Sequence, residues 1–95
     1  MARLPDTEIA RELAGLPGWT VDDGSICRTF AFASFPDAVA FVNRLVPGAE
    51  AADHHPDIEI HYRHVTLRWT THSEGGLTRK DIEGARASEA LAARG

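Results

Sequence analysis

Cysteine, long apolar runs and clustered positive charge are all scarce in this chain of 95 residues. The single cysteine, Cys27, excludes an internal disulfide and is typical of a reducing compartment. No apolar run approaches the roughly 20 residues that a membrane-spanning helix needs, and the N-terminus lacks the apolar centre of a signal peptide. Lysine and arginine number 10 against 14 acidic residues and form no basic block, which argues against a nucleic-acid surface. We therefore expect a cytoplasmic protein that binds neither membrane nor nucleic acid.

Length and composition favour a single domain over residues 1–95. Hydrophobic residues make up 43% of the chain and charged residues 25%, which is the balance of an ordinary globular protein. A domain of this size buries only about 60% of the surface that its unfolded chain exposes, so its stability on its own is modest. Association with further copies of the chain would add to that stability.

Helices are predicted in three places from hydrophobic spacing and capping residues. A capping-box pattern begins the last of them at Thr78, three residues before Asp81. Pro47 is expected to break or kink the middle helix near Val46, although a further turn could run to about Asp53. The predicted helices cover residues 6–16, about 34–53 and about 78–92.

Strands are predicted where apolar and polar residues alternate, which is the pattern of a strand with one face in water. Ile58 and Ile60 alternate with Glu59, and Val65 and Leu67 continue the alternation after a tight turn. Because the strands arrive in pairs with short connections, antiparallel hairpins are favoured over crossover units. The expected fold is α+β in the order α-β-β-α-β-β-α, with three helices on one face of a four-stranded antiparallel sheet. The predicted strands cover residues 19–21, 25–33, 58–62 and 65–71.

All five histidines lie between positions 54 and 72, and this concentration is the most informative feature of the sequence. His54 and His55 precede Pro56 in the loop after the middle helix, and His72 follows the last strand. All three therefore stand at the edges of regular structure, where a rigid scaffold presents functional groups. Histidine exchanges protons near neutral pH, because its ordinary pKa is about 6.5.

Three interpretations of the histidines are open on the residues alone. They could be ordinary surface residues, which is the interpretation that we keep for His61 and His64 beside the hairpin turn. They could bind a metal together with Asp53 or Glu50, but adjacent histidines point in different directions and no chelating spacing such as HExxH is present. They could instead act as general acid and base in a proton-transfer reaction.

The stretch from Glu50 to the last helix resembles the pterin-4a-carbinolamine dehydratase family. The family pattern has an acidic residue, three further positions and His-His-Pro, followed by an aromatic residue, a valine, Thr-His, Gly-Leu-Thr/Ser and an Asp. The resemblance is clear over about residues 30–92. The matching positions are Glu50, His54-His55-Pro56, Tyr62, Val65, Thr71-His72, Gly76-Leu77-Thr78 and Asp81.

The resemblance implies a fold, an assembly and a reaction. It implies a saddle-like α+β domain that assembles as a homodimer or as a tetramer of paired dimers. The implied reaction is the dehydration of a 4a-hydroxy-tetrahydropterin to quinonoid dihydropterin, in the recycling of the pterin cofactor of aromatic amino-acid hydroxylases. No metal or other cofactor is expected, because the N5 lone pair of the pterin can expel the C4a hydroxyl group while an acid and a base move the protons.

By the same resemblance, His54 and His72 are expected to be the catalytic acid and base, with His55 gripping the pterin or sharing the catalytic role. Glu50 and Asp81 are expected to support them, Glu50 by holding His54 across a helical turn and Asp81 by capping the last helix and orienting a histidine. The rival function is that of a non-catalytic binding, assembly or dimerisation protein on the same fold, and the presence of all three histidines favours the enzyme. The residues expected to line the pterin pocket are Asp53, Thr70, Thr71 and Ser73.

Overall fold

The structure is a computed structural model that describes residues 2–94 and contains three α-helices, one short 3-10 helix and four strands. The α+β class and the order α-β-β-α-β-β-α are therefore confirmed. In chain order the elements are α1 (Asp6–Ala14), β1 (Thr20–Asp22), β2 (Ser25–Ala31), α2 (Phe35–Ala52), β3 (Asp57–His61), β4 (His64–Trp69), η1 (His72–Glu74) and α3 (Arg79–Ala92).

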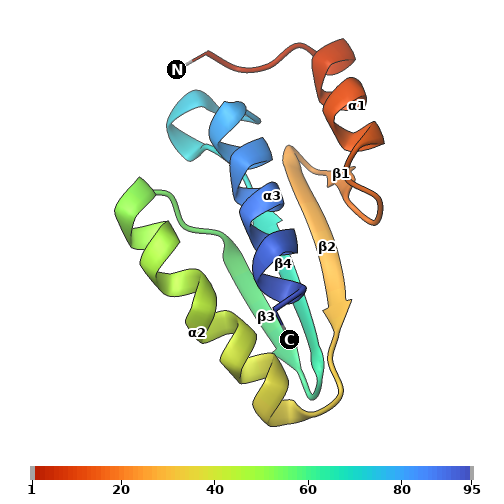
Figure 1. The fold of residues 1–95 in the computed structure, drawn as a ribbon. Coiled ribbons are helices and arrows are strands. Elements are labelled where there is room, and N and C mark those ends of the chain that lie inside the picture. Colours follow the sequence, from red (N-terminus) through yellow and green to blue (C-terminus); the bar gives the residue numbers. More distant parts are fainter. Residues whose placement is uncertain (1, 95) are drawn as a thin grey trace.

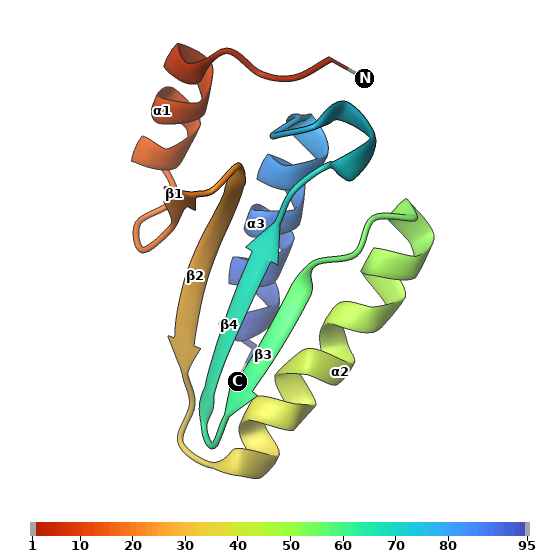
Figure 2. The ribbon, with the colours of Figure 1, turned by 180° about the vertical axis from the view of Figure 1, so that it is seen from behind.

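The strands form one antiparallel sheet, as expected, and their order in the sheet is β1-β2-β4-β3. Hairpins join β1 to β2 and β3 to β4, and β4 pairs with β2 so that Phe30 lies opposite Val65. Helices α2 and α3 pack against each other and against β4 on one face of the sheet (Figure 1). Seen from behind, the strands lie in front of α3, and α1 lies beyond the end of β2 (Figure 2).

The core fills the space between the sheet and the two packed helices. Val65 and Leu67 of β4 are fully buried and Trp69 is nearly so, which confirms the alternation predicted for this strand. Phe41 of α2 and Ile82 of α3 are fully buried from the helix side. Burial of each such side chain contributes about 1.5–3 kcal/mol.

Helix α2 runs without interruption through Pro47, so the expected break near Val46 was wrong and the further turn is confirmed. Proline removes one backbone hydrogen bond from a helix, but Pro47 is exposed to solvent while other residues of α2 hold the helix on the core. The helix ends at Asp53, whose backbone is left-handed with φ 49° and ψ 45°. The buried residues that anchor α2 are Ala38, Phe41, Leu45 and Ala49.

Strand β3 lies at the edge of the sheet and has no buried face, contrary to the expectation of one wet face and one dry face. Ile58 and Ile60 stand opposite Leu67 and Val65 in the register, yet they remain 38% and 39% exposed. The alternation correctly predicted a strand, but it carries no information on whether the helical layer extends over that strand.

Helix α1 is tied to the beginning of α3 by the carboxylate of Glu12. Arg79 donates to Glu12 at 2.7 Å, and Arg86 donates to the other oxygen of the same carboxylate. The hydrogen bond from Arg79 is the main reason that the pKa of Glu12 is lowered from its ordinary value. This ion-paired cluster fixes the N-terminal helix next to the turn in which α3 begins.

Candidate active site

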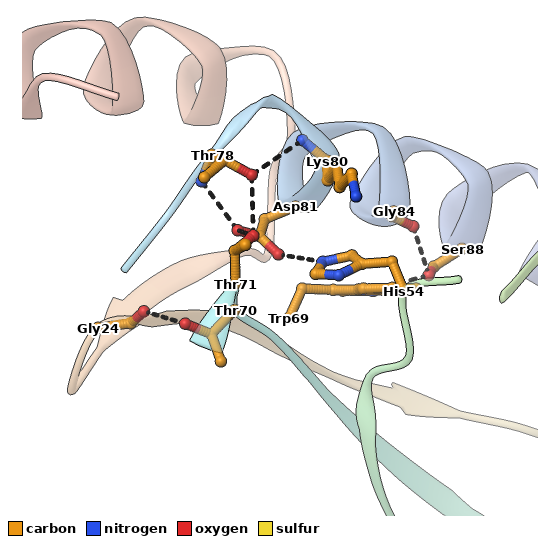
Figure 3. Close-up of polar contacts among 10 residues, drawn as sticks. All are labelled: Gly24, His54, Trp69, Thr70, Thr71, Thr78, Lys80, Asp81, Gly84 and Ser88. Atoms are coloured by element: carbon orange, nitrogen blue, oxygen red, sulfur yellow. Dashed lines mark hydrogen bonds and ion pairs between the residues drawn. The ribbon is translucent and has the colours of Figure 1, made fainter. Parts of the chain in front are cut away.

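The buried carboxylate of Asp81 is the centre of the site. Its side chain is fully inaccessible to solvent. One oxygen, Oδ2, accepts the backbone N–H of Thr78 at 2.9 Å and the hydroxyl of Thr71 at 2.8 Å. The other, Oδ1, lies 2.6 Å from Nε2 of His54 (Figure 3). Three hydrogen-bond partners therefore surround this carboxylate, so that neither of its buried oxygens lacks one.

The capping motif of α3 and the loop before it determine the position of Asp81. Thr78 caps α3 and forms the predicted capping box with Asp81, because a carboxylate at the third helical position reaches back to the N-cap amide. The preceding loop closes through an isolated bridge between Thr71 and Gly76. Gly75, whose φ is 71°, supplies the left-handed turn that this closure needs. The loop therefore brings Thr71 directly beneath the first turn of α3.

His54 is oriented by two contacts. A carboxylate can only accept a hydrogen bond, so Nε2 donates to Asp81. The imidazole also stacks on the indole of Trp69, with ring centroids 5.5 Å apart and an angle of 27° between the planes. The side chain is 11% exposed, and among residues 2–94 the second nitrogen, Nδ1, makes no hydrogen bond. His54 and Trp69 together line an apolar groove of about 230 Å³ between α2 and α3.

Glu50 holds a different histidine from the one expected. Its carboxylate lies 2.5 Å from Nε2 of His55, and both side chains are exposed. The i, i+4 contact between Glu50 and His54 requires a continuous helix, and the left-handed residue Asp53 ends α2 just before His54. The chain reversal therefore turns His54 toward Asp81 and leaves His55 beside Glu50.

His72 begins η1 and is exposed. It lines a polar depression of about 650 Å³ together with Asp57, Arg68 and Thr70. His54 lines the apolar groove between α2 and α3, and His55 lines a third depression beside Pro56. Within residues 2–94, the single chain thus presents the three histidines at three separate depressions.

The four residues expected to line the pterin pocket lie in different structural environments. Thr71 belongs to the buried Asp81 cluster, and the hydroxyl of Thr70 donates to the carbonyl of Gly24 at 2.8 Å. Asp53 is exposed at the end of α2, and Ser73 is exposed in η1. The structure therefore brings Thr71 together with His54 through Asp81.

Trp69 is the site residue that the sequence did not reveal. The alternation of β4 placed it in the core, and a core tryptophan carries no sign of which side chain will lie on its face. Its contact with His54 joins β4 to the loop after α2. Gly84 is a second site residue that the sequence did not reveal, because the sequence alone does not show how closely α3 approaches the sheet.

Within residues 2–94, no three His, Cys, Asp or Glu side chains gather closely enough to hold a metal ion. In the same range, each helix is too short or too polar to cross a bilayer.

Fold and site define a small α+β domain in which a buried aspartate orients a histidine at the wall of an interhelical groove. The chain belongs to the pterin 4 alpha carbinolamine dehydratase family, whose model matches residues 2–91. The resemblance seen in the sequence is thereby confirmed.

Individual relatives agree with this assignment. The chain is 56% identical over 81 residues to a Picosynechococcus sp. protein named "Putative pterin-4-alpha-carbinolamine dehydratase", covering 85% of this chain and 88% of the relative. It is 50% identical over 91 residues to a protein of the same name from Chloroflexus aurantiacus, covering 96% of this chain and 98% of the relative. A solved structure described as a transcriptional coactivator/pterin dehydratase from Brucella Melitensis matches with a TM-score of 0.91 at 38% identity, over 95% of this chain and 98% of that chain.

Proposed function

We propose that this protein is a dehydratase that converts a 4a-hydroxy-tetrahydropterin into quinonoid dihydropterin and water, in the cytoplasm, as part of pterin recycling. The observation that carries the proposal is the pairing of His54 with the buried Asp81, in a chain of this family. The names of the relatives support the same activity.

The proposed reaction moves two protons and breaks one carbon–oxygen bond. The N5 lone pair forms a double bond to C4a as the C4a–O bond breaks. An acid protonates the departing oxygen, which leaves as water, and a base accepts the proton of N5. The electron pair comes from the pterin itself, so the proposal requires no metal and no further cofactor.

Histidines supply both proton transfers in this proposal, with His54 and His72 as acid and base and His55 gripping the pterin or sharing the catalytic role. Because the three histidines line separate depressions of the single chain, the proposal requires the bound pterin to bridge them or a second copy of the chain to complete the site. The hydrogen bond from Nε2 of His54 to Asp81 leaves Nδ1 to exchange a proton with the substrate. The anionic carboxylate stabilises the imidazolium that forms when Nδ1 accepts that proton. Asp53, Thr70, Thr71 and Ser73 remain the proposed residues of the pterin pocket.

The direct test is the rate at which a freshly generated 4a-hydroxypterin loses water with and without the protein, followed by absorbance. Each general acid or base contributes about 10²–10⁴-fold, so catalysis is expected to exceed spontaneous decay by at least that factor. Decay at the spontaneous rate at all protein concentrations would refute the enzyme and favour the binding or assembly function.

We further propose that the chain forms a homodimer or homotetramer, with the edge of β3 in the contact. An edge strand presents unpaired backbone groups that a second strand can complete. The exposed side chains of Ile58 and Ile60 lie along this edge, and Val46 of α2 is also 50% exposed. Pairing would bury apolar surface that a domain of this size needs for stability.

The substitution Ile60→Lys is expected to shift the protein toward the monomer, because a charge would be buried against the second copy without a partner. Light scattering after size exclusion, at matched concentrations, measures the mass directly. Val21→Lys is the control, since Val21 is an exposed apolar residue of β1 at the opposite edge of the sheet. An Ile60→Lys protein with the parent's oligomeric mass contradicts the proposed interface.

A further inference from the structure

The indole of Trp69 is fixed from the side of α3 by two residues of that helix. Its Nε1–H donates to the hydroxyl of Ser88 at 3.2 Å, and that hydroxyl donates to the carbonyl of Gly84 at 2.7 Å (Figure 3). Gly84 also lies against the ring itself, because a Cβ at this position would stand only 2.6 Å from the nearest indole carbon. The ring is 5% exposed and has little freedom to move.

His54 also rests on this indole, with its imidazole stacked on the flat ring. The contact with Asp81 fixes one atom of the imidazole, Nε2, but a single hydrogen bond leaves the ring able to pivot about that atom. A flat ring stacked at 27° removes this freedom, since pivoting would drive the imidazole into the indole. Asp81 and Trp69 together therefore define both the position and the plane of the ring.

The indole face also suits both protonation states of a catalytic imidazole. The face of an aromatic ring carries partial negative charge and attracts a cation that lies over it. A neutral imidazole stacks there as one aromatic ring on another. The support does not have to move when His54 gains or loses a proton.

We propose that Trp69 is a positioning residue for His54: Gly84 and Ser88 hold the indole, and the indole sets the plane in which Nδ1 of His54 meets the pterin. This inference rests on the proposed dehydratase activity. The indole acts through the histidine and is assigned no contact with the reacting atoms.

Kinetics of two variants test the role. Trp69→Leu keeps an apolar side chain but removes the flat face, so kcat is expected to fall about ten- to a hundredfold while KM changes little. Trp69→Phe restores a flat ring without the hydrogen bond to Ser88 and is expected to recover most of kcat. A Trp69→Leu enzyme with the parent's kcat, in a protein whose His54→Gln variant is inactive, overturns the inference.

Tryptophan fluorescence gives a readout that does not depend on activity. A protonated imidazole in contact with indole quenches its emission, so the emission of the parent is expected to fall as the pH is lowered. His54→Gln should lose this change. Gly84→Ala, whose new Cβ pushes on the indole, is expected to reduce it.

The matched control is Gly48→Ala, the same change on α2, where an added Cβ meets nothing within 4 Å. Its pH-dependent emission is expected to equal that of the parent. An identical pH profile in the parent and in His54→Gln means that the two rings do not interact, whatever the activity. Failure of the parent to dehydrate the pterin, with the emission change present, instead refutes the proposed function and leaves the stacking intact.

Discussion

The variant His72→Ala is expected to lose about 10²–10⁴-fold in kcat for 4a-hydroxypterin dehydration, the usual contribution of one general acid or base. The loss should come without unfolding, because His72 is exposed at the start of η1 and its hydrogen bond within the turn is made by its backbone carbonyl. Exposed substitutions of this kind generally change stability by within about 0.5 kcal/mol. Rates against 4a-hydroxypterin and thermal unfolding curves, measured side by side, separate the two effects.

The companion variant is His54→Gln, for which a loss of similar size is expected. Glutamine can still donate a hydrogen bond to Asp81, so the buried carboxylate keeps a partner, whereas alanine would leave it short of one. The controls are His61→Ala and His64→Ala, which remove exposed histidines of the β3–β4 hairpin and should leave the rate unchanged. Full activity in both His72→Ala and His54→Gln would show that the assigned roles are wrong.

Asp81→Ala is expected to have the largest effect on stability, at about 3–5 kcal/mol, because each buried donor left without its acceptor costs about 1–3 kcal/mol. The substitution removes the acceptor for the Thr78 amide, the Thr71 hydroxyl and the His54 imidazole at once. Chemical denaturation of the variant and the parent measures the difference.

Asp81→Asn separates the catalytic role from the structural one. The amide oxygen can still accept from Thr78 and Thr71, but the amide nitrogen then faces Nε2 of His54 and forces the imidazole into its other tautomer. Activity is therefore expected to fall by far more than stability.

Asp37→Asn is the matched control for the substitutions at position 81. Asp37 occupies the equivalent third position of α2, where the Ser34 hydroxyl accepts its amide N–H. That change should cost no more than about 1 kcal/mol, the usual value of a carboxylate near a helix N-terminus. Equal losses at positions 37 and 81 would show that Asp81 acts only on the helix.

Features that depend on neighbouring residues were predictable from the sequence. The capping box of α3 involves residues three apart, and the burial of Val65 and Leu67 follows from alternation within one strand. Histidines 54, 55 and 72 stood out because of their clustering and their family pattern. The signals for capping and for strand burial lie within a few residues of the features that they predict.

Features that depend on packing between distant elements were not predictable. The spacing of Glu50 and His54 suggested a contact across one helical turn, but the left-handed backbone of Asp53 sends His54 to a carboxylate 27 residues further along the chain. The persistence of α2 through Pro47 depends on the residues that anchor it to the core. Local propensity contains neither kind of information.

The close approach of Gly84 to Trp69 places two distant positions under a joint evolutionary constraint. A lineage that retains the indole has to retain glycine opposite it, because any larger residue would displace the ring. A lineage in which a smaller residue replaces Trp69 can accept a larger residue at position 84. Substitutions at positions 69 and 84 should therefore be correlated, so that the combined volume of the two side chains is preserved while the residue at each position varies.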